Sequence, residues 1–354
     1  MINQLTFTRF LAAMMVVIYH YGRTTSTFNG ETMTAILKYG NSAVSYFFIL
    51  SGFVMIIAYG KRTTKLDKIA YYVNRIARIY PVYILALLAV ALIAFQSSDG
   101  LSFKALILQG LVIQSWFPAY VMGLNPPGWS LSVEAFFYFL FPFLLSLYHR
   151  VNMQMVSFGI VLFWLFTQLL FNYLLVSQQT LIPSNFLFYA PIMHLNQFLI
   201  GNLMGFLYFK YEKRNFDALL LLMGLLLPVV ILSVDRFASF LSYHNGLLAC
   251  YYAPFILMMA LNNGAISFWL SKRLFVILGE ISYGIYILQK PVYSIVMRIG
   301  EMLSVNGTLI LFIFIFSLLL ISLLSYYFIE LPTRQFVNMR YQRFRSKTNV
   351  VAST

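Results

Sequence analysis

Apolar segments of about 20 residues follow one another along almost the whole chain, and they constrain its fold more than any other feature. A helix of about 20 apolar residues crosses a bilayer. Only 10% of the 354 residues are charged and 61% are hydrophobic, whereas a soluble domain carries about 25% charged residues. We therefore predict an all-α integral membrane protein. The ten predicted spans are 4–22, 42–60, 72–96, 131–148, 153–176, 188–208, 216–234, 244–262, 276–297 and 307–329.

One further apolar stretch, 103–122, is short and runs into Asn125-Pro-Pro-Gly128, which breaks helices. We treat it as interfacial or re-entrant. With the N-terminus inside, inner loops then hold seventeen of the 24 Lys and Arg residues and outer loops hold five. A full crossing at 103–122 would move eleven of the inner charges outward, against the positive-inside rule. The topology predicted is ten helices with both termini in the cytoplasm.

The apolar segments leave no room for a separate soluble domain. We predict one polytopic membrane domain over 1–335 and a basic cytoplasmic tail over 336–354. The net charge of +14 does not indicate a nucleic-acid partner, because the basic residues lie in loops between spans and report orientation. The single cysteine, Cys250, excludes an intrachain disulfide and a Cys-type metal site, and the four histidines lack metal-ligand spacing, so no metal is expected.

Arg9 and His20 are polar residues inside the first apolar stretch, which lacks the marks of a cleaved signal peptide. A central Arg in a membrane helix costs about 2.5–3.5 kcal/mol. Their eleven-residue separation would turn both side chains to the same face of a helix, about 16 Å apart along its axis. The topology places Arg9 toward the cytoplasm and His20 toward the outer face. We predict both as catalytic residues, with His20 as the base that deprotonates a hydroxyl.

Glu134 is an acidic residue at the outer end of the fourth predicted span, the depth assigned to His20. A carboxylate near an imidazole raises its basicity and fixes its tautomer. Glu134 is therefore predicted to orient His20. The alternative is a buried structural ion pair of Glu134 with Arg9 or Lys290.

Arg75 and Arg78 lie three residues apart, so they share a helix face beside an inner basic loop. The planar guanidinium suits bidentate binding of phosphate, and attraction to anionic lipid is the alternative. In the second span, Ser51-Gly52 predicts close helix packing, or else an approach of the backbone to a ligand.

Gln289 and Lys290 are polar residues in the ninth apolar run, where they are expected to face a cavity or to have a structural role before Pro291. With Trp129 and Ser132 they form the predicted acceptor pocket. Of the remaining histidines, His194 is a candidate to line a cavity, and His244 is expected to be solvated in an outer loop.

Several passages, in this order, resemble the membrane acyltransferase-3 family. They are Arg9 followed by His20 in an Arg-x10-His pattern, Phe47–Phe53 as Phe-Phe-x-x-Ser-Gly-Phe, Arg75–Pro81, Trp129–Glu134 and Ile281–Tyr286. Together they span about 3–290, and the ordered set is more specific than any one passage.

The resemblance implies transfer of an acetyl or other short acyl group from cytoplasmic acyl-CoA. The acceptor implied is a hydroxyl of a cell-surface or lipid-linked glycan, such as O-antigen or exopolysaccharide, at the bacterial inner membrane. His20 corresponds to the essential histidine, Arg9 to its partner and Glu134 to the acidic position. Arg75 and Arg78, with Ser51, would bind acyl-CoA, which acts as a substrate, and no tightly bound cofactor is expected.

Two departures from the family pattern affect the mechanism. Ala135 stands where many relatives have a second acidic residue, and Gln289 stands where many have histidine. The first weakens a two-carboxylate mechanism, and the second indicates that His20 suffices or that the acceptor pocket differs. The competing function is a transporter or flippase, which also needs deep polar residues and broken helices, but the sequence shows no two-fold internal similarity.

Overall fold

The computed structural model describes residues 2–22, 30, 34, 37, 39–61, 66–96, 100–177, 182–237 and 243–351. In this part of the chain the secondary structure is helical, apart from one isolated bridge between Arg214 and Asn262. The prediction of an all-α protein is confirmed.

Long helices coincide with the predicted spans. They are α1 (Asn3–Tyr21), α3 (Ala43–Tyr59), α4 (Lys68–Phe95), α6 (Trp129–Tyr148), α7 (Met153–Val176), α9 (Leu195–Lys210), α10 (Asp217–Phe237), α11 (Ala249–Leu261), α14 (Ser282–Met302) and α15 (Gly307–Ser325). Five helical stretches among the described residues are long and apolar enough to cross a membrane: Gly40–Tyr59, Lys68–Phe95, Pro126–Tyr148, Met153–Val176 and Gly307–Arg343. The number of crossings and the side of the termini stay predictions.

Shorter elements connect these helices. They are η2 (Gly40–Ser42), α5 (Phe103–Gly110), η3 (Gln114–Trp116), η4 (Pro126–Gly128), α8 (Ser184–Tyr189), η5 (Pro191–His194), α12 (Ala265–Leu270) and α13 (Arg273–Glu280). At the C-terminal end a π-helical turn, η6 (Tyr326–Glu330), joins α15 to α16 (Leu331–Val351).

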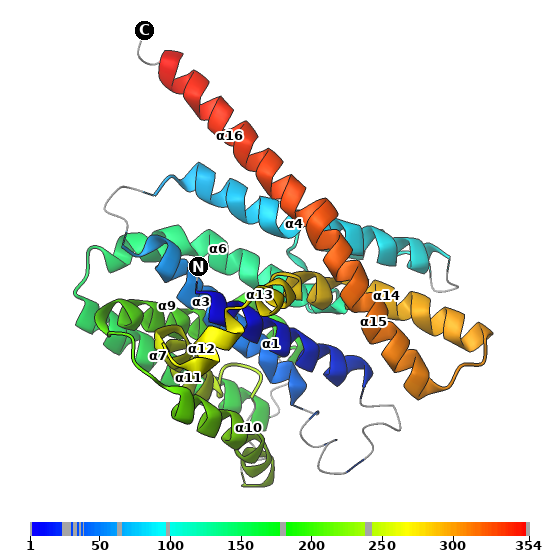
Figure 1. The fold of residues 1–354 in the computed structure, drawn as a ribbon, viewed down its shortest axis with the longest axis horizontal. Coiled ribbons are helices and arrows are strands. Elements are labelled where there is room, and N and C mark those ends of the chain that lie inside the picture. The colour runs from blue at the N-terminus through cyan, green and yellow to red at the C-terminus, as the bar shows by residue number, and fades with distance from the viewer. Residues whose placement is uncertain are drawn as a thin grey trace.

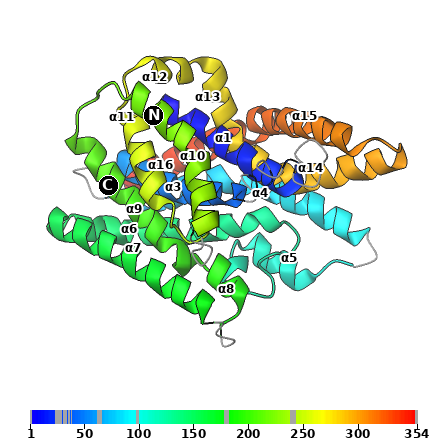
Figure 2. The ribbon, with the colours of Figure 1, turned by 90° about the horizontal axis from the view of Figure 1, so that it is seen from below.

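The helix α1 lies at the centre of the helical bundle, where it contacts α3, α13 and α14 (Figure 1). The helices α14 and α15 pair with each other and project from one side of the bundle (Figure 2). The predicted tail is helical as far as it is described. As part of α16 it contacts α4, and the hydroxyl of Tyr341 donates to Asp67 Oδ2 at 2.9 Å.

The helices α3 and α9 pack closely through glycine. A Cβ atom at Gly52 would overlap the carbonyl oxygen of Phe198, and one at Gly201 would overlap that of Ile49. Small residues let two helix backbones approach in this way. Gly52 therefore has the packing role predicted for it, and it fixes the helix that carries Ser51.

The stretch 103–122 contains no helix of membrane length, because α5 has eight residues. After α5 the chain folds back into the bundle with its polar side chains buried. The amide of Gln114 donates to the carbonyl of Gly128 at 2.6 Å, and that of Asn125 donates to the carbonyl of Ile287 at 3.1 Å. This arrangement agrees with a re-entrant segment, and it places the first turn of α6 inside the protein.

Replacing Gly201 with alanine should destabilise the bundle by about 1–3 kcal/mol, because the added methyl group overfills the α3–α9 contact. The matched control is Gly159→Ala in α7, where a Cβ atom meets no described atom within 4 Å. That variant should be neutral or slightly more stable, since alanine favours helix over glycine. The thermal midpoint of the purified protein in detergent measures both, and equal midpoints would contradict the packing interpretation.

Candidate active site

A cavity of about 570 Å³ lies among α1, α3, α4, α6, α14 and the α15–α16 junction. Its volume is typical of small-molecule sites. We call this cavity the chamber. Five of the predicted site residues, from four helices, line it: Arg9, Ser51, Arg75, Arg78 and Glu134.

The start of α1 is fixed on two sides, and this places Arg9 in the chamber. Gln4 donates its amide to the carbonyl of Met259 at 3.2 Å. On another side, Gly279 of α13 lies so close to α1 that a Cβ atom there would overlap the carbonyl of Thr6. Arg9 lies on α1 within one helical turn of Thr6, so these two contacts also fix its position.

Glu134 projects from α6 toward α3. Its Oε1 accepts hydrogen bonds from the hydroxyl of Ser51, at 3.2 Å, and from the hydroxyl of Tyr138. The negative charge of Glu134 also acts on Arg9. Among the described contacts no ion pair joins Glu134 to Arg9 or Lys290, so the structural ion pair drawn from the sequence as the alternative is not seen there; Glu134 and Arg9 line the same chamber.

His20 and Glu134 are not brought together. His20 is exposed in the last turn of α1, where its ring lies beside those of Tyr19 and Tyr21, and it is not among the residues that line the chamber. The physical reason is the re-entrant segment: α6 begins inside the bundle, so Glu134 lies at the level of Arg9. The sequence-based expectation that Glu134 orients His20 is not supported.

Arg75 is held by tyrosines. Its guanidinium lies 5.8 Å from the ring centres of Tyr59 and Tyr71 and 5.4 Å from that of Tyr138. Nη2 also donates to the hydroxyl of Tyr59 at 3.2 Å. Cation–π contacts stabilise a guanidinium without neutralising it, so the positive charge of Arg75 remains available to a ligand.

None of the four residues predicted for an acceptor pocket is among the chamber-lining residues. Ser132 accepts from the backbone N–H of Ser115 at 3.3 Å. Gln289 is fully buried and donates to the carbonyl of Tyr286, one helical turn back, at 2.6 Å. Both therefore have structural partners. Lys290 is half-buried on α14.

Trp129 belongs to a cluster of aromatic rings and histidines that lies behind Phe48, a residue of the chamber wall. Its ring stacks on His244 at 5.4 Å and lies 5.2 Å from His194. His194 is fully buried, and its Nε2 bonds to the carbonyl of Phe188 at 2.9 Å. The expectation that His244 is solvated is wrong, because the α8–η5 segment folds over it.

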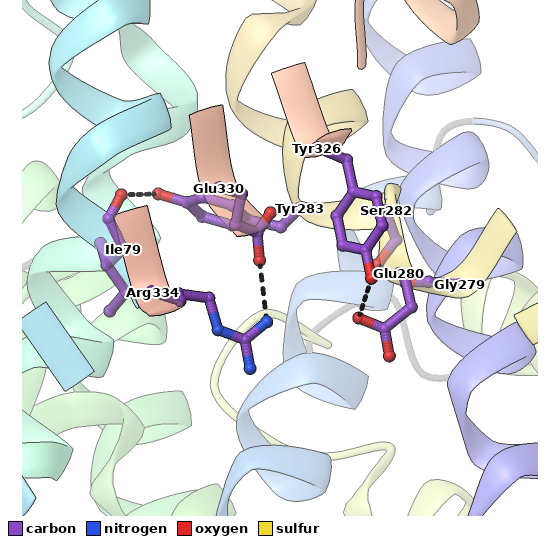
Figure 3. A network of polar contacts seen from close by, with 8 residues as sticks. All are labelled: Ile79, Gly279, Glu280, Ser282, Tyr283, Tyr326, Glu330 and Arg334. Atoms are coloured by element: carbon purple, nitrogen blue, oxygen red, sulfur yellow. Dashed lines mark hydrogen bonds and ion pairs between the residues drawn. The ribbon is translucent and has the colours of Figure 1, made fainter. Parts of the chain in front are cut away.

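Further chamber residues come from the C-terminal half and were not predicted as site residues: Glu280, Tyr283, Tyr286, Glu330 and Arg334. Figure 3 shows how several of them are held. Arg334 Nη1 lies 3.5 Å from Glu330 Oε1, and the hydroxyl of Tyr326 donates to Glu280 Oε2 at 3.4 Å. The sequence carries two signals for them: Tyr283 and Tyr286 lie in the family-like passage Ile281–Tyr286, and Glu330 is an acidic residue directly after a long apolar run.

The chamber thus combines four arginines with three glutamates, which gives it a small excess of positive charge. Such a site suits an anionic ligand, because guanidinium groups bind phosphate and carboxylate oxygens in pairs. Within the described residues no group of three or more His, Cys, Asp or Glu side chains is arranged to hold a metal ion.

Comparison with known proteins identifies the class of protein to which this site belongs. A family model described as an acyltransferase domain, acyltransferase 3, matches residues 2–327. The chain therefore belongs to the acyltransferase-3 family. It is 32% identical over 160 residues to the acyltransferase MdmB of Streptomyces mycarofaciens. This alignment covers 42% of the present chain and 41% of MdmB.

A second relative matches over more of the chain. The O-acetyltransferase OatA of Staphylococcus aureus (strain NCTC 8325 / PS 47) is 23% identical over 369 aligned positions, covering 92% of this chain and 56% of OatA. The chain thus spans about half the length of these relatives. No solved structure matches it.

The exposed position of His20 at the end of α1 predicts its accessibility. In a Cys250→Ser background, which removes the exposed native thiol, a His20→Cys variant should react with an impermeant maleimide added outside intact cells. Lys213→Cys, exposed in the loop after α9, should react only after the membrane is permeabilised. Labelling of His20→Cys only after permeabilisation would place His20 on the cytoplasmic side and reverse the predicted topology.

Proposed function

We propose that this protein is a membrane O-acyltransferase of the bacterial inner membrane. It moves an acetyl or other short acyl group from cytoplasmic acyl-CoA, with acetyl-CoA as the expected donor. The acceptor is a hydroxyl of a cell-surface or lipid-linked polysaccharide, such as O-antigen or exopolysaccharide. The observation that carries the proposal is the chamber with its arginines, inside a chain of the acyltransferase-3 family.

The donor enters the chamber on the side of α4, which carries Arg75 and Arg78. Arg75 and Arg78 bind the phosphates of acyl-CoA, because the guanidinium forms paired hydrogen bonds with phosphate oxygens. The pantetheine arm carries amides, and the polar groups of Ser51, Glu134 and Tyr138 can bond with them. Arg9 also binds a phosphate of the donor, because it lies about 16 Å from His20 along α1 and the thioester reacts at His20.

The acceptor reacts at the outer end of α1. His20 takes the proton of the acceptor hydroxyl, whose oxygen attacks the thioester carbonyl carbon. The carbon–sulfur bond breaks, and CoA leaves as the thiol after taking up a proton. An acyl-histidine intermediate uses the same residue in two steps. In both routes the acyl arm extends outward from the level of Arg9, about 16 Å along the helix axis.

The name of OatA, an O-acetyltransferase, supports acetyl transfer to oxygen. Transport of a solute is the competing function. A thiol assay separates the two, because only the enzyme releases CoA from acetyl-CoA, whereas a transporter would accumulate solute without doing so. Mass spectrometry of surface glycan from cells with and without the gene would identify the acceptor.

His20→Ala should lower acyl transfer by about 10²–10⁴-fold, the range lost with a general base, while the protein still inserts and binds CoA. The control is His149→Ala, which removes an exposed histidine at the end of α6 and should leave transfer unchanged. CoA release and glycan acetylation are the measurements. Normal acetylation by His20→Ala would refute the role of His20.

Arg78→Met should raise the KM for acetyl-CoA about tenfold, because one charge-assisted contact to phosphate is lost, with a smaller effect on kcat. Arg273→Met removes an exposed arginine from α13 and should leave KM unchanged. Steady-state CoA release in proteoliposomes tests both. An unchanged KM in Arg78→Met would move the phosphate site away from the chamber.

A further inference from the structure

The helix that ends the chain contains a π-helical turn at the chamber. The residues of η6 (Tyr326–Glu330) interrupt the α-helical pattern between α15 and α16. A π turn inserts one residue, which rotates the following side chains by about 100° around the axis. Such turns are rare and occur frequently at functional sites. Here the turn ends on Glu330, which faces the chamber.

Glu330 is a buried carboxylate among cations. Only 4% of its surface is exposed. Arg334, one turn further along α16, lies 3.5 Å from its Oε1, and the positive charges of Arg78 and Arg9 also act on it. A buried carboxylate is stable only with such compensation. The turn is also held from α13, since the hydroxyl of Tyr326 donates to Glu280.

The arginines of the chamber fall into two groups. Arg75 is surrounded by tyrosine rings, which leave its charge uncompensated. Arg334 instead forms an ion pair with Glu330 at 3.5 Å, and Arg9 and Arg78 line the same chamber as that carboxylate, whose charge acts on both. An anionic ligand therefore meets one guanidinium held by aromatic rings, one that is ion-paired with Glu330, and two others that line the same chamber.

We propose that Glu330 is a positioning residue that acts as an internal counter-ion. While the chamber is empty, its carboxylate pairs with Arg334 and offsets the charges of Arg9 and Arg78; when the donor binds, the anionic part of the donor takes its place. The carboxylate competes with the donor and so lowers donor affinity. This inference rests on the proposed binding of acyl-CoA in the chamber.

Competition between Glu330 and the donor predicts that removing the charge of Glu330 lowers the Kd for CoA, which a purely structural role does not predict. Glu330→Gln keeps the size of the side chain and removes its charge. Because like charges no longer repel, the Kd of the purified protein for CoA should fall about tenfold. A residue that only supports the fold would weaken binding when replaced, or leave it unchanged.

Isothermal titration of CoA into the purified full-length protein in detergent measures this Kd. The matched control is Glu212→Gln, which removes the same charge from an exposed loop after α9 and should leave the Kd unchanged. Glu330→Asp is a second variant for the case that Glu330→Gln does not fold. It keeps the buried charge but withdraws it from the arginines, so the Kd should fall about twofold.

An unchanged or higher Kd in Glu330→Gln, or in Glu330→Asp if only that variant folds, overturns the role of Glu330. An equal fall in Glu212→Gln also overturns it, because total charge would then explain the effect. If the wild-type protein does not bind CoA, the donor site itself is refuted. That result is distinct from CoA binding that does not tighten when Glu330 is replaced.

Discussion

The cationic charge of Arg9 inside an apolar bundle is the constraint on which the rest of the site depends. Arg9 is half-buried and shares the chamber with three glutamates, Glu134, Glu280 and Glu330, whose negative charges favour a cation there. They come from α6, from the end of α13 and from the turn before α16, which are far apart in the sequence. The chamber therefore lies where helices that are distant in the sequence bring these charges together beside α1.

Much of this arrangement could be predicted from the sequence, for two physical reasons. The thickness of the bilayer fixes the length of apolar helices, so the helices fall on the predicted segments. Polar residues in such segments are costly, which is why Arg9, Ser51 and Glu134 stand out within their apolar runs. The chamber brings these three residues together with Arg75 and Arg78.

The expectations for Glu134 and Trp129 failed, and Glu330 was missed, because the backbone has features that apolar patterns do not reveal. Span length assigns Glu134 to the depth of His20, but the buried amides of Gln114 and Asn125 draw the preceding loop into the bundle. Trp129 then packs on His244 and on Phe48 of the chamber wall. Glu330 reaches the chamber through a π turn, and such a turn is set by tertiary packing, which a single sequence does not encode in any short motif.

The helix α1 holds Arg9 and His20 apart, in two different surroundings. Arg9, near its start, lies among compensated charges in the chamber, and His20, in its last turn, is exposed. In the chamber wall, Phe47 contacts the ring of Tyr286 at 5.8 Å, and Ser130 donates to the Tyr286 hydroxyl at 2.8 Å. These side chains line the chamber on its α3, α6 and α14 walls. If the proposed donor binds by its phosphates at the level of Arg9, its acyl arm has to extend about 16 Å along α1 to reach His20, and acyl-pantetheine is a flexible arm that can do so.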